Sequence, residues 1–236
     1  MSKSKEILRM LPLYVLVLSG MILGALHTDK AVTAMAENQP MAQRKTVIID
    51  PGHGGVDGGA TSCTGILESK FNLDISMRLR DVLHLLGIRT VMIRTVDASI
   101  YSEGDTIAAQ KVSDLKERVK IANGTSDAIL ISIHQNYYPD SKYFGAQVFY
   151  APTEHSAELA NSMQTAFTQT INPGSRRRSK KADGIYLMQH VHCPAILIEC
   201  GFISNPREEA LLRSDAYQKN LCCVIATIVS QSIGDS

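Results

Sequence analysis

Residues 47–60 read VIIDPGHGGVDGGA, an apolar run that passes directly into a glycine-rich loop. The run predicts a short buried strand that ends at Asp50. In an α/β sheet, the carboxyl ends of the strands open into the crevice where ligands bind. Five glycines would let the loop backbone approach a ligand closely. A phosphate cradle is one interpretation, but neither the P-loop spacing nor the dinucleotide-binding spacing is present. His53 inside the loop favours a metal instead.

Downstream of this stretch, the chain alternates between β-rich runs and helical periods. Apolar residues repeat at helical spacing from Leu67 to Leu86, and Gly87 ends that period. Ser113 is the expected N-cap of a helix that continues to Ala122. The pattern predicts a single α/β domain whose central sheet is mostly parallel and flanked by helices. Further strands are expected at 89–93, 128–133, 146–150 and 195–198, and further helices at 154–171, shortly after 206, and at 217–233.

Upstream, the chain begins with a positively charged flank and an apolar run. Lys3, Lys5 and Arg9 precede the run 10–26, which holds no charge. This order is typical of a signal peptide or a signal anchor. A possible cleavage site ends at Ala36, but it lies far beyond the run, which favours an uncleaved membrane anchor. We therefore expect an exported chain with a signal peptide or anchor at 1–27, a linker at 28–44 and a catalytic domain at 45–236.

The composition of the whole chain excludes several classes of protein. The chain has 236 residues, which suffices for one sizeable domain. A formal net charge of +1 argues against a strongly basic nucleic-acid binder. With 44% hydrophobic residues the composition is globular, and five cysteines are too few for a disulfide scaffold.

Three more candidate residues lie at the ends of predicted elements. Glu68 starts the helix after the glycine loop, His134 ends the strand at 128–133, and Glu199 ends the strand at 195–198. Alone, each has an ordinary explanation: a helix-dipole charge for Glu68, a core histidine for His134, a buried salt bridge for Glu199. Together with His53 they offer two histidines, a carboxylate ligand and a second, unbound Glu. This set is typical of a catalytic zinc site with a general base.

The motifs DPGHGGVDGGA, Glu68, SIHQN at 132–136 and IECGFISN at 198–205 resemble, in that order, the zinc-dependent N-acetylmuramoyl-L-alanine amidases. The resemblance covers residues 46–233 and includes Arg94 and Arg118. It implies one Zn²⁺ per chain and hydrolysis of the amide between the lactyl group of N-acetylmuramic acid and L-alanine of the peptidoglycan stem peptide. The implied metal ligands are His53, Glu68 and His134, the implied catalytic acid–base is Glu199, and Asn136 would line the substrate groove.

Within that family, GIYLMQ at 184–189 and the segment 113–119 are most similar to the germination-specific spore-cortex members. That similarity implies a role in cortex maturation for muramic-lactam formation, outside the cytoplasm at the forespore or cell wall. The sequence shows no wall-binding repeat, so we expect the N-terminal segment, or an activating or targeting protein, to bring the chain to its substrate. Two alternatives stay open: a non-catalytic peptidoglycan-binding module, and a zinc peptidase or deacetylase acting on another wall substrate.

Two further clusters have no place in the family pattern. His190, His192 and Cys193 could form a metal cluster, but a rim or solvent-exposed position is the expectation. The run RRRSKK at 176–181 reads first as a solvated turn. The alternative is a contact with an anionic stem peptide, a wall polymer or a membrane surface.

Overall fold

The computed structural model describes residues 45–234. The predicted signal segment 1–27 and linker 28–44 lie outside the described residues. Within 45–234, every helix is too short or too polar to cross a membrane.

A six-stranded sheet forms the centre of the domain, in the order β2-β1-β3-β6-β4-β5. The pairs β1–β2, β1–β3 and β3–β6 are parallel, whereas β4 runs antiparallel to β6 and parallel to β5. This confirms the predicted α/β class with a mostly parallel sheet. The strands are β1 (Thr46–Pro51), β2 (Thr90–Met92), β3 (Ala128–Asn136), β4 (Gln147–Tyr150), β5 (Lys180–Lys181) and β6 (Ala195–Phe202).

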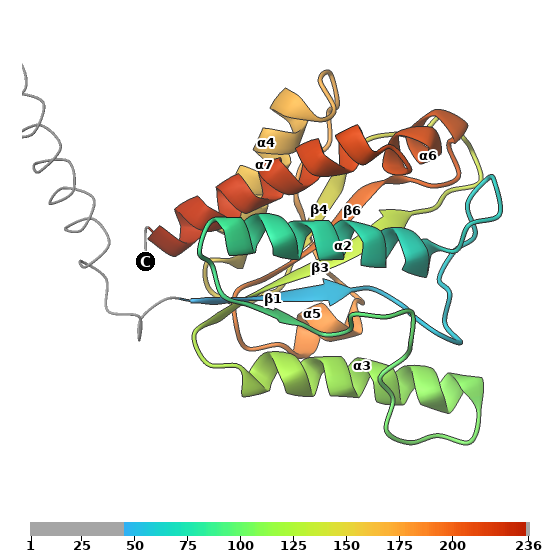
Figure 1. The fold of residues 1–236 in the computed structure, drawn as a ribbon, viewed down its shortest axis with the longest axis vertical. Helices are drawn as coiled ribbons and strands as arrows, with labels where there is room; N and C mark the ends of the chain where they lie inside the picture. The colour runs from blue at the N-terminus through green and yellow to red at the C-terminus, as the bar shows by residue number, and fades with distance from the viewer. Residues whose placement is uncertain (1–44, 235–236) are drawn as a thin grey trace, which may run out of the picture. The chain divides into compact units, whose positions relative to one another are not determined.

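Helices cover both faces of the sheet (Figure 1). One face packs against α2, α4 and α7, and the other against α3 and α5. Because side chains alternate along a strand, Val47 and Ile49 enter the first core while Ile48 enters the second. The helices are α2 (Glu68–Leu85), α3 (Ile107–Gly124), α4 (Ser156–Thr170), α5 (Tyr186–His190), α6 (Pro206–Leu212) and α7 (Asp215–Gly234).

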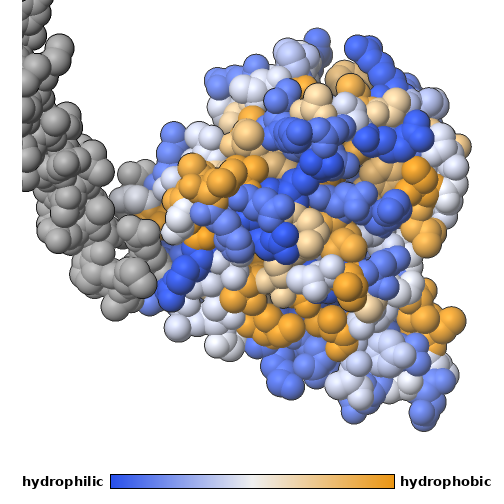
Figure 2. Space-filling model, in the orientation of Figure 1, coloured by the Kyte–Doolittle hydropathy of each residue, from blue (hydrophilic) through white to orange (hydrophobic). Residues whose placement is uncertain are grey.

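The outer surface around α2 follows from the amphipathic pattern of that helix. A hydrophilic band crosses the middle of the face seen in Figure 2, where α2 lies, and hydrophobic side chains gather above and below it. The helix buries Phe71, Ile75 and Leu79 against the sheet and leaves Asp74 and Asp81 in solvent. Its first turn is thereby fixed at the carboxyl edge of β1, which positions Glu68.

The start of α3 differs from the expectation. Ser113 is not an N-cap: the helix begins at Ile107, and the hydroxyl of Thr106 accepts the hydrogen bond from the Ala109 amide at 3.2 Å. The buried Ser113 hydroxyl instead accepts from the Ser102 and Glu103 amides, which fixes the incoming loop on the helix. Both residues are good caps, and only the tertiary contact decides between them. The two short elements β5 and α5 were also not predicted.

Candidate active site

The glycine loop after β1 is shaped by close approaches that exclude a side chain. A Cβ atom at Gly52 would lie 2.2 Å from Nε2 of His134, so the imidazole ring packs directly on the loop backbone. A Cβ atom at Gly59, whose φ is +69°, would lie 2.6 Å from Oε2 of Glu68. At these two positions glycine allows a histidine and a glutamate to reach the loop.

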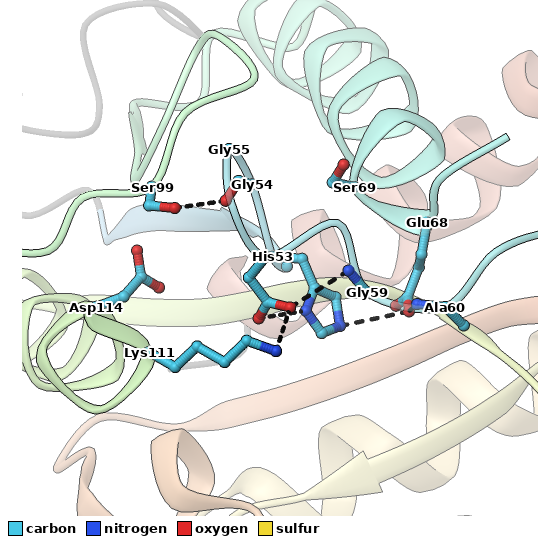
Figure 3. Close-up of polar contacts among 12 residues, drawn as sticks. His53, Gly54, Gly55, Gly59, Ala60, Glu68, Ser69, Ser99, Lys111 and Asp114 are labelled. Carbon is cyan, nitrogen blue, oxygen red and sulfur yellow. Dashed lines mark hydrogen bonds and ion pairs between the residues drawn. The ribbon is translucent and has the colours of Figure 1, made fainter. Parts of the chain in front are cut away.

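Three predicted ligand side chains converge on this loop. His53 comes from the loop itself, Glu68 from the first turn of α2 and His134 from the end of β3. The Glu68 carboxylate lies 3.3 Å from Nε2 of His53 and 3.0 Å from Nδ1 of His134 (Figure 3 shows the first of these contacts). One ligand atom from each residue lies within 4.8 Å of the others. Two imidazole nitrogens and a carboxylate oxygen are a donor set that suits zinc.

The surrounding backbone holds Glu68 as an ionised carboxylate. Its side chain is buried and accepts hydrogen bonds from the amides of Ala60 at 3.0 Å and Gln135 at 3.1 Å. Burial opposes the charge, but hydrogen bonds from His134 and His53 outweigh it and hold the pKa of Glu68 well below its usual range. A carboxylate that stays charged is ready to serve as a ligand.

Asp57 and Lys111 extend the cluster outward from His53. Nδ1 of His53 lies 2.9 Å from the Asp57 carboxylate, and Nζ of Lys111 lies 2.8 Å from the other oxygen of that carboxylate (Figure 3 labels His53 and Lys111). Burial opposes a charge on His53, yet Glu68 and Asp57 raise its pKa to about 9. The contact with Asp57 orients the ring, so that Nε2 faces Glu68. Sequence reasoning missed both residues, although the spacing of four from His53 to Asp57 was a usable signal.

Glu199 lies beside His134 but outside the ligand cluster. The two residues are register partners on β6 and β3. They share a pocket of about 310 Å³ with His53. Oε2 of Glu199 is buried without a hydrogen-bond partner, and burial raises the pKa of this carboxyl to about 7. A carboxyl group that titrates near neutral pH can both accept and donate a proton.

Two buried arginines donate hydrogen bonds to the backbone at the start of the glycine loop. Arg118 pairs with Asp50 and donates to the carbonyl oxygens of Pro51 at 3.0 Å and His53 at 2.8 Å. Arg94 donates to the Pro51 carbonyl at 2.9 Å and the Gly52 carbonyl at 3.0 Å. Two of these contacts end on the last residue of β1 and two on the first residues of the loop, so the chain's own side chains hold the backbone where the loop begins.

The other predicted residues lie apart from this cluster. Asn136 ends β3 opposite Phe202, at the same sheet edge but outside the lining of the pocket. The exposed His190 bonds to the Tyr186 carbonyl at 2.8 Å and stacks on the ring of that residue. His53, Glu68 and His134 form the single group of three metal-type side chains found within residues 45–234. The expected rim position of His190 thus agrees with its exposure.

An α/β sheet with this donor set and a neighbouring buried carboxyl group has features typical of a metal-dependent hydrolase. A family model described as N-acetylmuramoyl-L-alanine amidase matches residues 47–231. The chain belongs to the N-acetylmuramoyl-L-alanine amidase family. The predicted amidase activity is confirmed by this match and by the amidase relatives.

Two relatives and two solved structures illustrate the match. The chain is 38% identical over 183 residues to the germination-specific N-acetylmuramoyl-L-alanine amidase of Bacillus subtilis, covering 77% of this chain and 76% of that protein. It is 32% identical to the amidase LytC of the same organism, covering 74% of this chain but only 32% of LytC. The CwlD amidase of Clostridioides difficile, solved in complex with the GerS lipoprotein, superposes with a TM-score of 0.77 at 33% identity, covering 81% of this chain and all of that one. An N-acetylmuramoyl-L-alanine amidase of Clostridium difficile 630 superposes with a TM-score of 0.71 at 33% sequence identity. The match covers 82% of this chain and 98% of that one.

Proposed function

We propose that one zinc ion, held by His53, Glu68 and His134, serves this chain in cleaving the amide between the lactyl group of N-acetylmuramic acid and L-alanine. The convergence of two imidazole nitrogens and an ionised carboxylate supports this assignment. Zinc bound there would activate a water molecule for attack on the amide carbonyl. Asp57 fixes the His53 ring, and Gly52 leaves room for the His134 ring.

The observation that carries the proposal is the unpartnered oxygen of Glu199 in the pocket that His53 and His134 line. Glu199 accepts a proton from the attacking water as the new C–O bond forms. It then donates that proton to the alanine nitrogen as the C–N bond breaks, which regenerates the carboxylate. The raised pKa of about 7 suits both transfers near neutral pH.

We place the reaction in the spore cortex, where cleavage prepares muramic acid for lactam formation ahead of germination. The similarity to the germination-specific amidase of Bacillus subtilis and to the CwlD amidase of Clostridioides difficile supports this setting. The chain would act outside the cytoplasm, exported by its N-terminal segment. That segment would keep it at the membrane, beside the forespore or cell wall.

An activating or targeting protein belongs to the same proposal. The CwlD structure contains the GerS lipoprotein, and a comparable protein would bring this chain to its substrate. Fractionation of cells tests the location. The full-length chain should sediment with the membrane. A shortened, soluble chain that starts at Glu37 would instead show that the N-terminal segment is a cleaved signal peptide.

Digestion of purified peptidoglycan tests the chemistry. The full-length chain should release L-alanine amino termini, should lose this activity when a chelator removes the metal, and should regain it when zinc is restored. New amino termini at other residues would instead indicate a peptidase, and new amines on the sugars a deacetylase. Binding without any new end group would indicate a non-catalytic wall-binding module.

A further inference from the structure

A second cavity opens at the same edge of the sheet, on the side of β4 and β5. It has a volume of about 660 Å³ and contains neither metal-type ligands nor acidic side chains. We call it the basic groove. Its principal lining residues are Lys142, Phe144, Arg176, Arg177, Arg178 and Lys180.

The basic groove begins one strand away from Glu199. Gln147 lines the groove and is the antiparallel register partner of Glu199. Residues directly opposite each other in such a pair place their side chains on the same face of the sheet, with Cα atoms about 4.5–5.5 Å apart. Nη1 of Arg177 donates to Oε1 of Gln147 at 3.2 Å. Register pairing therefore places the proposed catalytic carboxyl group one strand away from the residue at which the basic groove begins.

Arg177 is fixed in place from the other side as well. Its guanidinium lies 4.8 Å from the centre of the Phe202 ring and donates through Nε to the Phe144 carbonyl at 2.9 Å. Phe202 is in turn the register partner of Asn136. Phe202 is thus a neighbour of Asn136, which is predicted to contact the substrate, and also of Arg177 in the wall of the basic groove.

Lys142 pairs with Asp140 at 2.7 Å, but the other free cations of the groove lack acidic partners among the described residues. The exposed Arg176, Arg178 and Lys180 form no ion pair among residues 45–234. The nearby Glu208 is occupied, because it accepts from the amides of Gly145 at 2.9 Å and Phe202 at 2.8 Å. The chain as a whole carries a net charge of only +1. This local excess of positive charge is therefore a property of the groove and not of the whole surface.

We propose that the basic groove binds free carboxylates of the stem peptide beyond the cleaved amide, an inference that rests on the proposed function. An extended peptide advances about 3.3 Å per residue. A chain that runs from Glu199 across Gln147 therefore reaches Arg177 within a few residues. The guanidiniums of Arg176 and Arg178 match carboxylates in geometry as well as charge. The exposed ring of Phe144 offers an apolar contact for the peptide between them.

The test compares two synthetic substrates, an N-acetylmuramoyl tetrapeptide with free carboxylates and the same compound with those carboxylates amidated. The full-length wild type should have the lower KM for the free acid. The double variant Arg176→Gln/Arg178→Gln should raise KM for the free acid about tenfold, the scale of one lost charge-assisted hydrogen bond. It should leave kcat, and KM for the amidated compound, unchanged.

A matched control removes two positive charges elsewhere. The variant Lys116→Gln/Lys120→Gln changes two exposed residues of α3 and should leave both KM values as they are. If both double variants raise KM equally, the effect is that of net charge and the groove assignment is wrong. If wild type cleaves both substrates with one KM, or if the groove variant loses only binding to phosphatidylglycerol vesicles, the inference fails while the amidase assignment stands. If wild type cleaves neither these two substrates nor purified peptidoglycan, the proposed function itself fails.

Discussion

The glycine loop at 52–60 and the basic loop at 174–180 lie at the same edge of the sheet, and arginine has different roles in the two. Arg94 and Arg118 are buried beside the glycine loop and bond to the carbonyl oxygens of Pro51, Gly52 and His53. Arg176 and Arg178 are exposed in the basic groove, with no acidic partner among the described residues. Residue type therefore does not separate a structural cation from one that is available to a ligand. Burial and the identity of the hydrogen-bond acceptor separate them.

The largest effect is expected from Glu199→Gln, on the catalytic side of the comparison. Loss of proton transfer should lower kcat on peptidoglycan by about 10²–10⁴-fold. Fold and zinc content should stay unchanged, because Glu199 lies outside the ligand cluster. The exposed Glu154→Gln serves as the control. Loss of zinc from Glu199→Gln, measured by metal analysis, would make this residue a ligand instead.

The two kinds of arginine can be compared directly through Arg118→Met and Arg178→Met. The first substitution leaves the buried Asp50 carboxylate without its partner and should lower the free energy of unfolding by about 3–5 kcal/mol. The second changes an exposed side chain and should shift it by less than about 0.5 kcal/mol. Urea unfolding with chelator present gives both values without a contribution from bound metal. If the two substitutions change the free energy of unfolding equally, Arg118 does not have the structural role that separates it from Arg178.

A smaller effect is expected from Asp57→Asn, which alters the orientation of His53. Residues that orient a ligand commonly contribute about 10–100-fold to metal affinity, so competition against a chromophoric chelator should show a loss in that range. Asp74→Asn, on the exposed side of α2, is the matched control. Unchanged zinc affinity in Asp57→Asn would mean that the ring of His53 is held by Glu68 alone.

The smallest effects concern pH and have opposite signs in the two regions. The Asp50 pKa is lowered below 3.8: burial opposes ionisation, but Arg118 outweighs it. Its stabilising contribution is therefore complete above about pH 4 and is lost as the pH falls through the lower folded value. Burial raises the pKa of Glu208 beside the basic groove, so the stability linked to its protonation is lost as the pH rises through that value. A tenfold difference in acid dissociation constant between the folded and unfolded chain corresponds to about 1.4 kcal/mol.

NMR titration of the two carboxyl carbons in metal-free protein measures both pKa values. Asp50 should titrate below its ordinary value and Glu208 above it. A normal value for Asp50 would contradict the buried ion pair with Arg118. A normal value for Glu208 would mean that water reaches the carboxylate beneath the groove.

The sequence was sufficient for much of the fold and for the three candidate ligands. His53, Glu68 and His134 lie at the ends of a strand, a helix and a strand, and elements of an α/β sheet bring such ends together. The structure places them within reach of one metal, while their role as ligands stays a prediction. The relation of Asp57 to Lys111 could not be predicted, because it depends on where α3 begins and how it packs beside the loop.

For the basic loop the sequence leaves two alternatives open, a solvated turn and a contact with an anionic partner. A run of arginines and lysines has the same appearance in a solvated turn and in a binding groove. What distinguishes them here is the ring of Phe202 under Arg177 and the pairing of Gln147 with Glu199. Both contacts join segments far apart in the chain, and β5 is only two residues long. Neither local pattern nor periodicity carries that information.

The arginine support of the glycine loop has a consequence for how quickly the site can be filled. Immobilising a backbone costs entropy, about 1–2 kcal/mol per residue, and glycine loses more freedom than any other residue. Arg94 and Arg118 compensate that loss when the chain folds, not when a ligand arrives. An ion held by the proposed ligands would therefore meet side chains that are already in position. We expect its capture to need no loop closure, so that the association rate rises in proportion to concentration, without a plateau set by the protein.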